Sequence, residues 1–129
     1  MEKSLLILNT STGSFLIDTN TIVRIEASSN YSKLYFSAAI GGSKTLVTAK
    51  VLKWFEQRLP PETFTRLHRS HLVNNCFLQL HQSTGNAFEL QNGKIIQVSR
   101  RRKKLVLMKI MKPQQVLALS KPVLLPPAC

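Results

Sequence analysis

The sequence is short of acidic residues: six aspartates and glutamates stand among 129 residues, and Asp18 is the single aspartate. This scarcity argues against catalysis by paired carboxylates and against a phospho-acceptor domain, whose site needs clustered acids. Two cysteines, Cys76 and Cys129, are too few for a disulfide framework, so we expect a cytoplasmic protein. No apolar run approaches the roughly 18–20 residues of a membrane span, and the N-terminus lacks the features of a signal peptide.

Positive charge is abundant and concentrated in the second half. The 18 lysines and arginines give a formal net charge of +12. Residues 1–65 hold seven cations and five acids, whereas residues 66–129 hold eleven cations and the single acid Glu89. A polyanionic partner, either nucleic acid or an anionic membrane, is the economical explanation of such a half. The alternative is a merely basic, solvated surface.

Length and apolar content favour one folded domain. The 129 residues include 43% hydrophobic and 19% charged residues, which is enough for a buried core. We expect the domain to occupy residues 1–112. Residues 113–129 contain four of the six prolines and are expected to form a loosely held tail.

Short apolar runs separated by turn residues predict a mainly β fold. Alternation in one run places Leu34 and Phe36 on one face of a strand and Lys33 and Tyr35 on the other. Asn92-Gly93 is a strong signal for a hairpin turn. The expected strands are Leu5–Leu8, Phe15–Ile17, Thr21–Ala27, Lys33–Ser37, Thr45–Thr48, Phe64–Leu67, Cys76–Leu80, Ala87–Leu90 and Ile95–Val98.

Two short helices are expected among these strands. Thr48 is a candidate N-cap for a mid-chain helix whose apolar stripe is Val51, Phe55 and Leu59, and Trp54 is expected to pack in the core. The second helix begins at Ser99 and ends at Pro113.

The sharpest functional signal is the run from Ser99 to Lys104. Ser99 is a good N-cap, so five cations fall in the first turns of the helix, where the helix dipole disfavours them. Sequences break a local rule mainly where function demands it. Backbone N–H groups and cations together favour an anion such as a phosphate backbone. A solvated charge run and a nuclear import signal are the alternatives.

Two further segments carry polar side chains suited to nucleic acid. Arg66–His71, followed by Asn74 and Asn75, mixes cations with small hydrogen-bonding residues. Its histidines, with His81 and Cys76, match no compact metal-ligand spacing, so we expect no metal, and His68 is expected to pack in the core or against a strand. Glu26–Lys33 is a polar loop between strands, which simple turn chemistry with a left-handed Asn30 would also explain. Catalytic motifs are lacking, so we expect neither an enzyme nor a cofactor.

Three segments together resemble the LytTR-type DNA-binding domain of bacterial transcription regulators. They are Ile25–Ala27 with Asn30-Tyr31, then Phe64–Asn74, then Val98–Lys104, and the similarity spans roughly residues 5–110. The resemblance implies an elongated arrangement of small antiparallel sheets, not a helix-turn-helix, whose loops insert into successive major grooves of duplex DNA. The expected DNA-binding residues are Asn30, Tyr31, Ser32, Lys33, Arg66, His68, Arg69, Ser70, Asn74, Ser99, Arg100, Arg101, Arg102, Lys103 and Lys104.

The resemblance also divides these residues by role. It implies base contacts by Ser32, Arg69 and Arg100. Phosphate contacts are implied for Lys33, Arg66, Ser70, Lys103 and Lys104. His71 departs from the family, which usually has a bulky apolar or aromatic residue at this place, so the packing there is expected to differ.

We therefore expect a stand-alone, cytoplasmic, bacterial transcription regulator that binds specific duplex DNA and no membrane. A second copy on an adjacent half-site, and a sensor or regulatory partner, are the possible protein partners. The alternative is a single-strand RNA-binding β-module that uses Tyr35 and Phe36 as stacking platforms. A third option, an interaction module that docks through Val116–Pro127, rests on apolar content alone.

Overall fold

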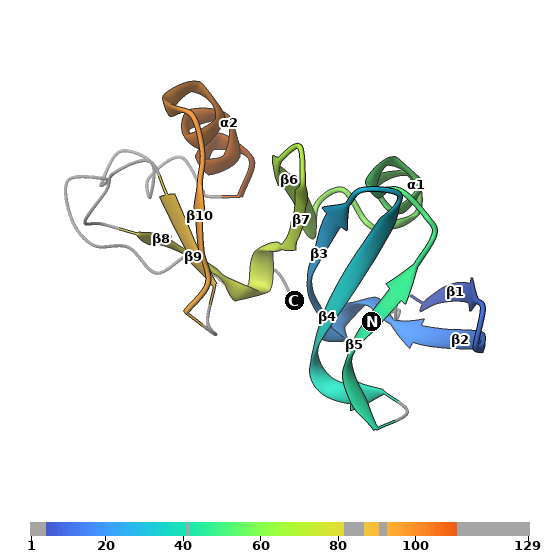
Figure 1. Ribbon diagram of the computed structural model, residues 1–129. Coiled ribbons are helices and arrows are strands. Elements are labelled where there is room, and N and C mark those ends of the chain that lie inside the picture. Colours follow the sequence, from blue (N-terminus) through green and yellow to red (C-terminus); the bar gives the residue numbers. More distant parts are fainter. Residues whose placement is uncertain (1–4, 41, 82–86, 91–92, 111–129) are drawn as a thin grey trace.

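The computed structural model describes residues 5–40, 42–81, 87–90 and 93–110 and shows a mainly β protein with two helices (Figure 1). Every strand pair in it is antiparallel. The fold class expected from the sequence is thereby confirmed. The predictions for residues 113–129, for the end of the second helix and for the turns at 83–86 and 91–92 fall outside the described residues.

The strands form three small sheets. A two-stranded hairpin contains β1 (Leu5–Thr10) and β2 (Gly13–Asp18). A five-stranded sheet has the order β5-β4-β3-β7-β6, and a three-stranded sheet has the order β10-β9-β8. The remaining bounds are β3 (Ile22–Ser28), β4 (Tyr31–Ile40), β5 (Ser43–Thr48), β6 (Phe64–His68), β7 (His71–Asn74), β8 (Leu78–His81), β9 (Ala87–Leu90) and β10 (Ile95–Gln97), with helices α1 (Leu52–Arg58) and α2 (Arg100–Ile110).

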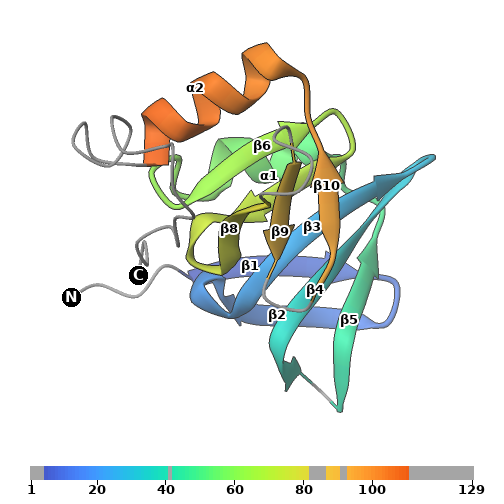
Figure 2. The same cartoon turned by 90° about the vertical axis from the view of Figure 1, so that its left-hand side faces the viewer.

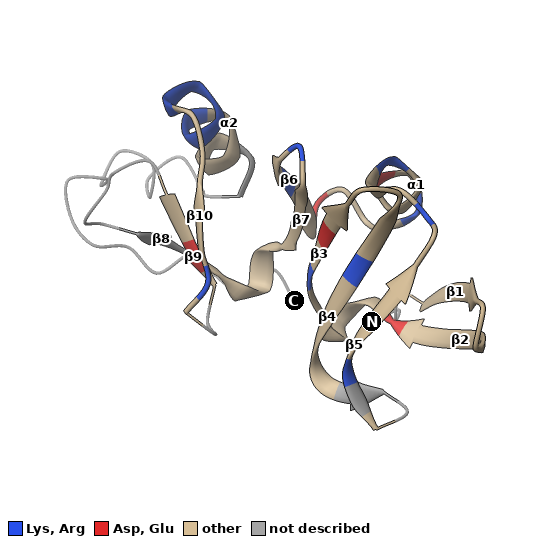
Figure 3. Ribbon diagram, viewed as in Figure 1, with Lys and Arg blue, Asp and Glu red and all other residues tan. Residues whose placement is uncertain are grey.

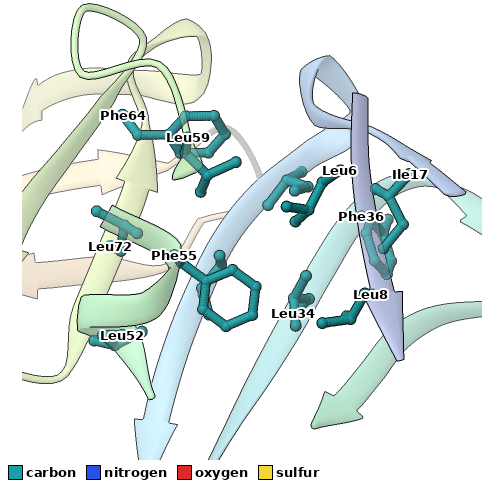
Figure 4. Packing of buried hydrophobic residues seen from close by; sticks show 12 residues of the cluster. Leu6, Leu8, Ile17, Leu34, Phe36, Leu52, Phe55, Leu59, Phe64 and Leu72 are labelled. Carbon is teal, nitrogen blue, oxygen red and sulfur yellow. The ribbon is translucent and has the colours of Figure 1, made fainter. Parts of the chain in front are cut away.

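The first core lies between one face of the five-stranded sheet, α1 and the β1–β2 hairpin (Figure 4). Alternation along β4 turns Leu34 and Phe36 into this core, as the sequence pattern predicts, and Phe55 enters it from α1. Trp54 is half-buried against the same cluster.

The second core lies on the other side of the molecule, where the five-stranded sheet meets the three-stranded sheet and α2 (Figure 1). Val73 of β7, Phe88 of β9 and Val106 of α2 are buried in it together. Burial of Val106 and Leu107 on one side of α2 anchors this helix, while Leu105 and Met108 stay exposed. The helix α2 is thereby held beside the five-stranded sheet.

Three local predictions are wrong, and one strand was not predicted. The N-cap of α1 is Val51, an exposed residue without a capping hydrogen bond, so neither Thr48 nor Val51 plays the role expected for it. Leu52 takes the place of Val51 in the apolar stripe. His71–Asn74 forms strand β7, which the polar residues at its two ends made hard to predict. The residues after it form a 3-10 turn, Asn75–Phe77, so β8 begins at Leu78 and not at Cys76.

The polar loop expected between β3 and β4 is also shorter than the sequence suggests. A two-residue turn joins the strands, because Tyr31, Ser32 and Lys33 already belong to β4. The left-handed residue is Ser29, with φ of 54°, and not Asn30.

Candidate nucleic-acid interface

Three segments that lie far apart in the sequence meet along one edge of the molecule (Figures 1 and 2). They are the β3–β4 turn (28–31), the β6–β7 turn (68–71) and the N-terminal turn of α2 (99–103), and together they are called the candidate interface. The backbone N–H of Ala27 donates to the carbonyl of Ser70 at 2.8 Å and joins the first two. Arg102 Nη1 donates to the carbonyl of Arg66 at 3.1 Å and joins α2 to β6. These are the three segments that the sequence singles out.

The β3–β4 turn presents Asn30 and Tyr31 to solvent, and Tyr31 is 53% exposed. Ser32 is different, because its side chain is 1% exposed and its hydroxyl donates to the carbonyl of Lys50 at 2.7 Å. The expected base contact by Ser32 is therefore wrong for this structure. Lys33 lies half-buried on the sheet, with Nζ 5.3 Å from the centre of the Tyr35 ring.

The β6–β7 turn presents His68 and Arg69. Both side chains are exposed, so His68 does not pack in the core, although its ring centre lies 5.7 Å from that of His71 in the neighbouring strand β7. The backbone N–H of Ser70 donates to His68 Nδ1 at 3.2 Å and stabilises the turn, while Ser70 itself is half-buried. The hydrogen-bond ladder shifts register between Arg66 and His68, and such irregularities change the direction in which neighbouring side chains point.

The Arg66 side chain of β6 bonds to the turn that follows it and to α1. Its Nε donates to the carbonyl of His68 at 2.9 Å, Nη2 donates to the carbonyl of Arg69, and Nη1 pairs with Glu56 of α1. All three nitrogens of the guanidinium are thus engaged with protein acceptors.

Asn74 is fully buried, which contradicts its expected contact with DNA. Its Nδ2 donates to the carbonyl of Ile22 at 2.9 Å, and its Oδ1 accepts from the backbone N–H of Cys76. The side chain thus ties β7 to β3 and begins the 3-10 turn that follows. We therefore interpret Asn74 as a residue that stabilises the fold.

The N-terminal turn of α2 holds cations under a serine cap, as predicted. Ser99 Oγ accepts from the backbone N–H of Arg102 at 3.0 Å. Arg100, Arg101, Arg102 and Lys104 are exposed, and Lys103 is half-buried. A groove between this turn and the β6–β7 turn is lined by Leu67, His68, Arg69, Gln97, Val98, Ser99 and Arg102.

Charge and dipole make this region attractive to an anion. Figure 3 shows basic residues at the start of α2 and at the tip of the β6–β7 hairpin. The exposed N–H groups at a helix start add partial positive charge, which a phosphate oxygen compensates. The edge therefore combines positive potential with exposed hydrogen-bond donors.

Beside the candidate interface lies a polar cluster that no sequence motif marks. Arg24 is buried, pairs with Glu26 at 2.6 Å, and places its guanidinium carbon 3.7 Å from the centre of the Tyr35 ring. Burial tends to raise the pKa of Glu26, but the hydrogen bond and charge of Arg24 outweigh it and hold that pKa below its ordinary value. The sequence feature that could have predicted this cluster is the alternation in β3, which puts Arg24 and Glu26 on the same face of the strand.

His71 lies opposite Glu26 across the β3–β7 pair. Burial lowers the pKa of the half-buried His71, and the cations Arg24 and Lys94 and the neighbouring His68 lower it further, while Glu26 opposes them. The surroundings of His71 thus disfavour its charged form.

The stacking platform required by the RNA alternative is not present. Phe36 is 5% exposed and belongs to the first core, and Arg24 lies over the Tyr35 ring. The two aromatic residues therefore offer no exposed pair of faces to unpaired bases.

Neither a metal cluster nor a membrane helix is found in the part of the chain that the structure describes. Within those residues, no group of three or more His, Cys, Asp or Glu side chains could hold a metal ion. Neither described helix has the length and apolar content needed to cross a bilayer.

Known proteins resemble the chain in sequence pattern and in fold. A family model described as the LytTr DNA-binding domain matches residues 12–111. A solved structure from Bacillus cereus, described as the LytTr DNA-binding domain of a methyl-accepting/DNA response regulator, is similar with a TM-score of 0.66. It has 23% sequence identity and covers 86% of this chain and 100% of its own, a likeness that shows the fold. No curated protein matches the chain.

Proposed function

Because the chain belongs to the LytTr DNA-binding domain family, which implies DNA binding and transcription regulation, we propose that it recognises specific sequences in the major groove of duplex DNA. The resemblance predicted from three sequence segments is confirmed by the family match. The observation that carries the finer proposal is the convergence of those segments along one basic edge.

Arg69 and Arg100 are the proposed base readers. Each side chain is exposed, one on a two-residue turn and the other at the first position of α2. Arginine is suited to guanine because its planar fork matches the O6 and N7 acceptors in the major groove. Both positions adjoin elements that bury side chains in the second core.

The other exposed or half-buried residues of the expected set, apart from Arg66, are proposed to contact the DNA backbone. Phosphates attract lysine and arginine regardless of base sequence and set the orientation of the protein on the duplex. The proposed backbone contacts are Asn30, Tyr31, Lys33, His68, Ser70, Ser99, Arg101, Arg102, Lys103 and Lys104.

Two copies of the chain are proposed to occupy two similar half-sites one or two helical turns apart. A single domain of this size contacts too few base pairs to be found among roughly 10⁶ or more competing genomic sites. A footprint that covers one half-site at full affinity would contradict this arrangement.

Selection from a random duplex pool tests the proposed function directly. The full chain should enrich one sequence class, and a labelled duplex of that class should be displaced by itself more readily than by a scrambled duplex or by single-stranded RNA. Equal competition by all three nucleic acids would refute sequence-specific duplex recognition, and preference for the RNA would support the alternative module.

A further inference from the structure

We propose that Arg66 is a positioning residue that aims the β6–β7 turn at DNA, with Glu56 as its anchor, and is not a phosphate contact. This inference rests on the proposed function and changes the role that the sequence resemblance implies for Arg66. It assigns Glu56 of α1, a residue that no sequence motif marks, to the recognition apparatus.

The first argument is the direction of the guanidinium. Its Nε and Nη2 donate to the carbonyls of His68 and Arg69, so the side chain of Arg66 clasps the backbone of the turn that follows it. These carbonyls lie beyond the register shift of the β6–β7 ladder. The guanidinium therefore stabilises a turn at the place where the ladder bonds become irregular.

The second argument is the ion pair with Glu56. Arg66 and Glu56 form a salt bridge in which the side chains are 28% and 38% exposed, so the guanidinium is directed towards α1. A DNA phosphate would have to compete with a carboxylate already in contact with Nη1. Charge-assisted bonds of this kind are stronger than neutral ones and carry a defined direction.

The third argument is the bond from α2. Arg102 Nη1 donates to the carbonyl of Arg66, so this short segment of β6 touches both helices. Arg66 is thereby bonded both to the backbone of Arg69 and to the N-terminal turn of α2. A side chain that contacts a base must be held within a fraction of an ångström of its binding position. The bonds made by Arg66 therefore affect how well Arg69 can recognise a base.

Arg66→Lys separates the two roles. A phosphate contact survives this change because lysine keeps the positive charge, whereas a single ammonium cannot reproduce the three directed bonds of the guanidinium. We expect Arg66→Lys to reduce the affinity ratio between the selected and the scrambled duplex by about tenfold or more, since several directed, charge-assisted bonds are lost. The affinity for scrambled duplex and the slope of log K against log salt should remain close to those of the wild type.

Glu56→Gln gives the complementary test. If Arg66 binds phosphate, removing the competing carboxylate should tighten binding to every duplex; if Arg66 is a brace, the affinity ratio should fall. Glu62→Gln is the matched control, because Glu62 is an exposed acid in the nearby α1–β6 connection and its loss changes the net charge equally. We expect Glu62→Gln to leave the ratio unchanged. Circular dichroism and thermal unfolding establish that each variant is folded before binding is measured.

The outcomes distinguish the brace from the proposed function. If the wild type selects a sequence and Arg66→Lys keeps the affinity ratio, or if Arg66→Ala lowers the salt slope by about 0.9 as loss of one phosphate contact would, the brace is refuted and sequence-specific binding stands. If the wild type selects no sequence, both are refuted. A lowered ratio in Arg66→Lys and Glu56→Gln, with an unchanged ratio in Glu62→Gln, supports the brace.

Discussion

The backbone N–H of Ala27 donates to the carbonyl of Ser70 at 2.8 Å, and this bond fixes the β3–β4 turn against the β6–β7 turn. Two polar turns that are separate in the sequence thereby become one continuous surface. Because the pairing of β3 with β7 extends from the sheet into these turns, their spacing depends on backbone geometry more than on their side chains. Substitutions of exposed side chains there should therefore change DNA binding more than folding.

Binding to duplex DNA should weaken steeply as salt increases. The second half of the chain holds eleven cations and one acid, and cations that engage phosphates release the counterions condensed on DNA. If roughly six to eight cations engage, the slope of log K against log salt should be about −5 to −7. Fluorescence anisotropy across a salt series measures this slope, and a value near zero would contradict the duplex interface.

Arg100→Ala should remove discrimination more than it removes affinity. An arginine that reads guanine contributes about 1–3 kcal/mol of discrimination, so the selected duplex should lose about that much while scrambled duplex changes little. Lys104→Ala should instead weaken both duplexes equally and reduce the salt slope by about one unit. Affinities on both duplexes at two salt concentrations measure these effects.

Lys44→Ala serves as a control for the loss of one cation, because exposed Lys44 lies in β5, away from the candidate interface. It should change neither duplex affinity appreciably. A common loss factor on both duplexes for Arg100→Ala would show that Arg100 holds phosphate and that another residue reads the base.

Asn74→Ala should destabilise the fold. The side chain is fully buried and bonds to the carbonyl of Ile22 and the part-buried backbone N–H of Cys76, so its removal takes these two bonds away. We expect the free energy of unfolding to fall by about 2–4 kcal/mol. Urea denaturation measures the loss, and exposed Asn20→Ala should stay within about 0.5 kcal/mol of the wild type. Similar midpoints for the two variants would refute the structural role of Asn74.

Stability should decrease as the pH falls below about 6.5, the ordinary pKa of histidine, and His71 should be one cause. Burial lowers the pKa of His71 in the folded state, so the unfolded chain takes up the proton first and is favoured as the pH falls towards the folded pKa. Arg24, Lys94 and His68 act in the same direction, and Glu26 opposes them.

Urea unfolding at pH 7.5 and pH 5.5 tests this assignment when the wild type is compared with His71→Leu. The variant has no imidazole to protonate, so its stability should fall less between the two pH values than that of the wild type. An identical decrease in both proteins would assign the pH dependence to other groups.

Local patterns in the sequence were sufficient for the fold class and for most hairpins. Leu34 and Phe36 alternate with polar residues, so the buried face of β4 follows from the two-residue period of a strand. Ser99 likewise predicts the start of α2, because its hydroxyl supplies a bond that the first helical turn otherwise lacks. The start of α1 was mispredicted because packing of Leu52 and Phe55, and not a capping side chain, determines where that helix begins.

The candidate interface likewise depends partly on local sequence and partly on tertiary structure. The sequence by itself determined that three polar segments, a basic second half and a cationic helix start belong to a nucleic-acid-binding domain, because charge and residue type are properties of the chain. Only the tertiary structure decided how those side chains are used: Ser32 and Asn74 are buried, and Arg66 is paired with Glu56 of α1. Burial and hydrogen-bond partners depend on residues distant in sequence, which strand pairing and helix packing bring together, and no local motif encodes them.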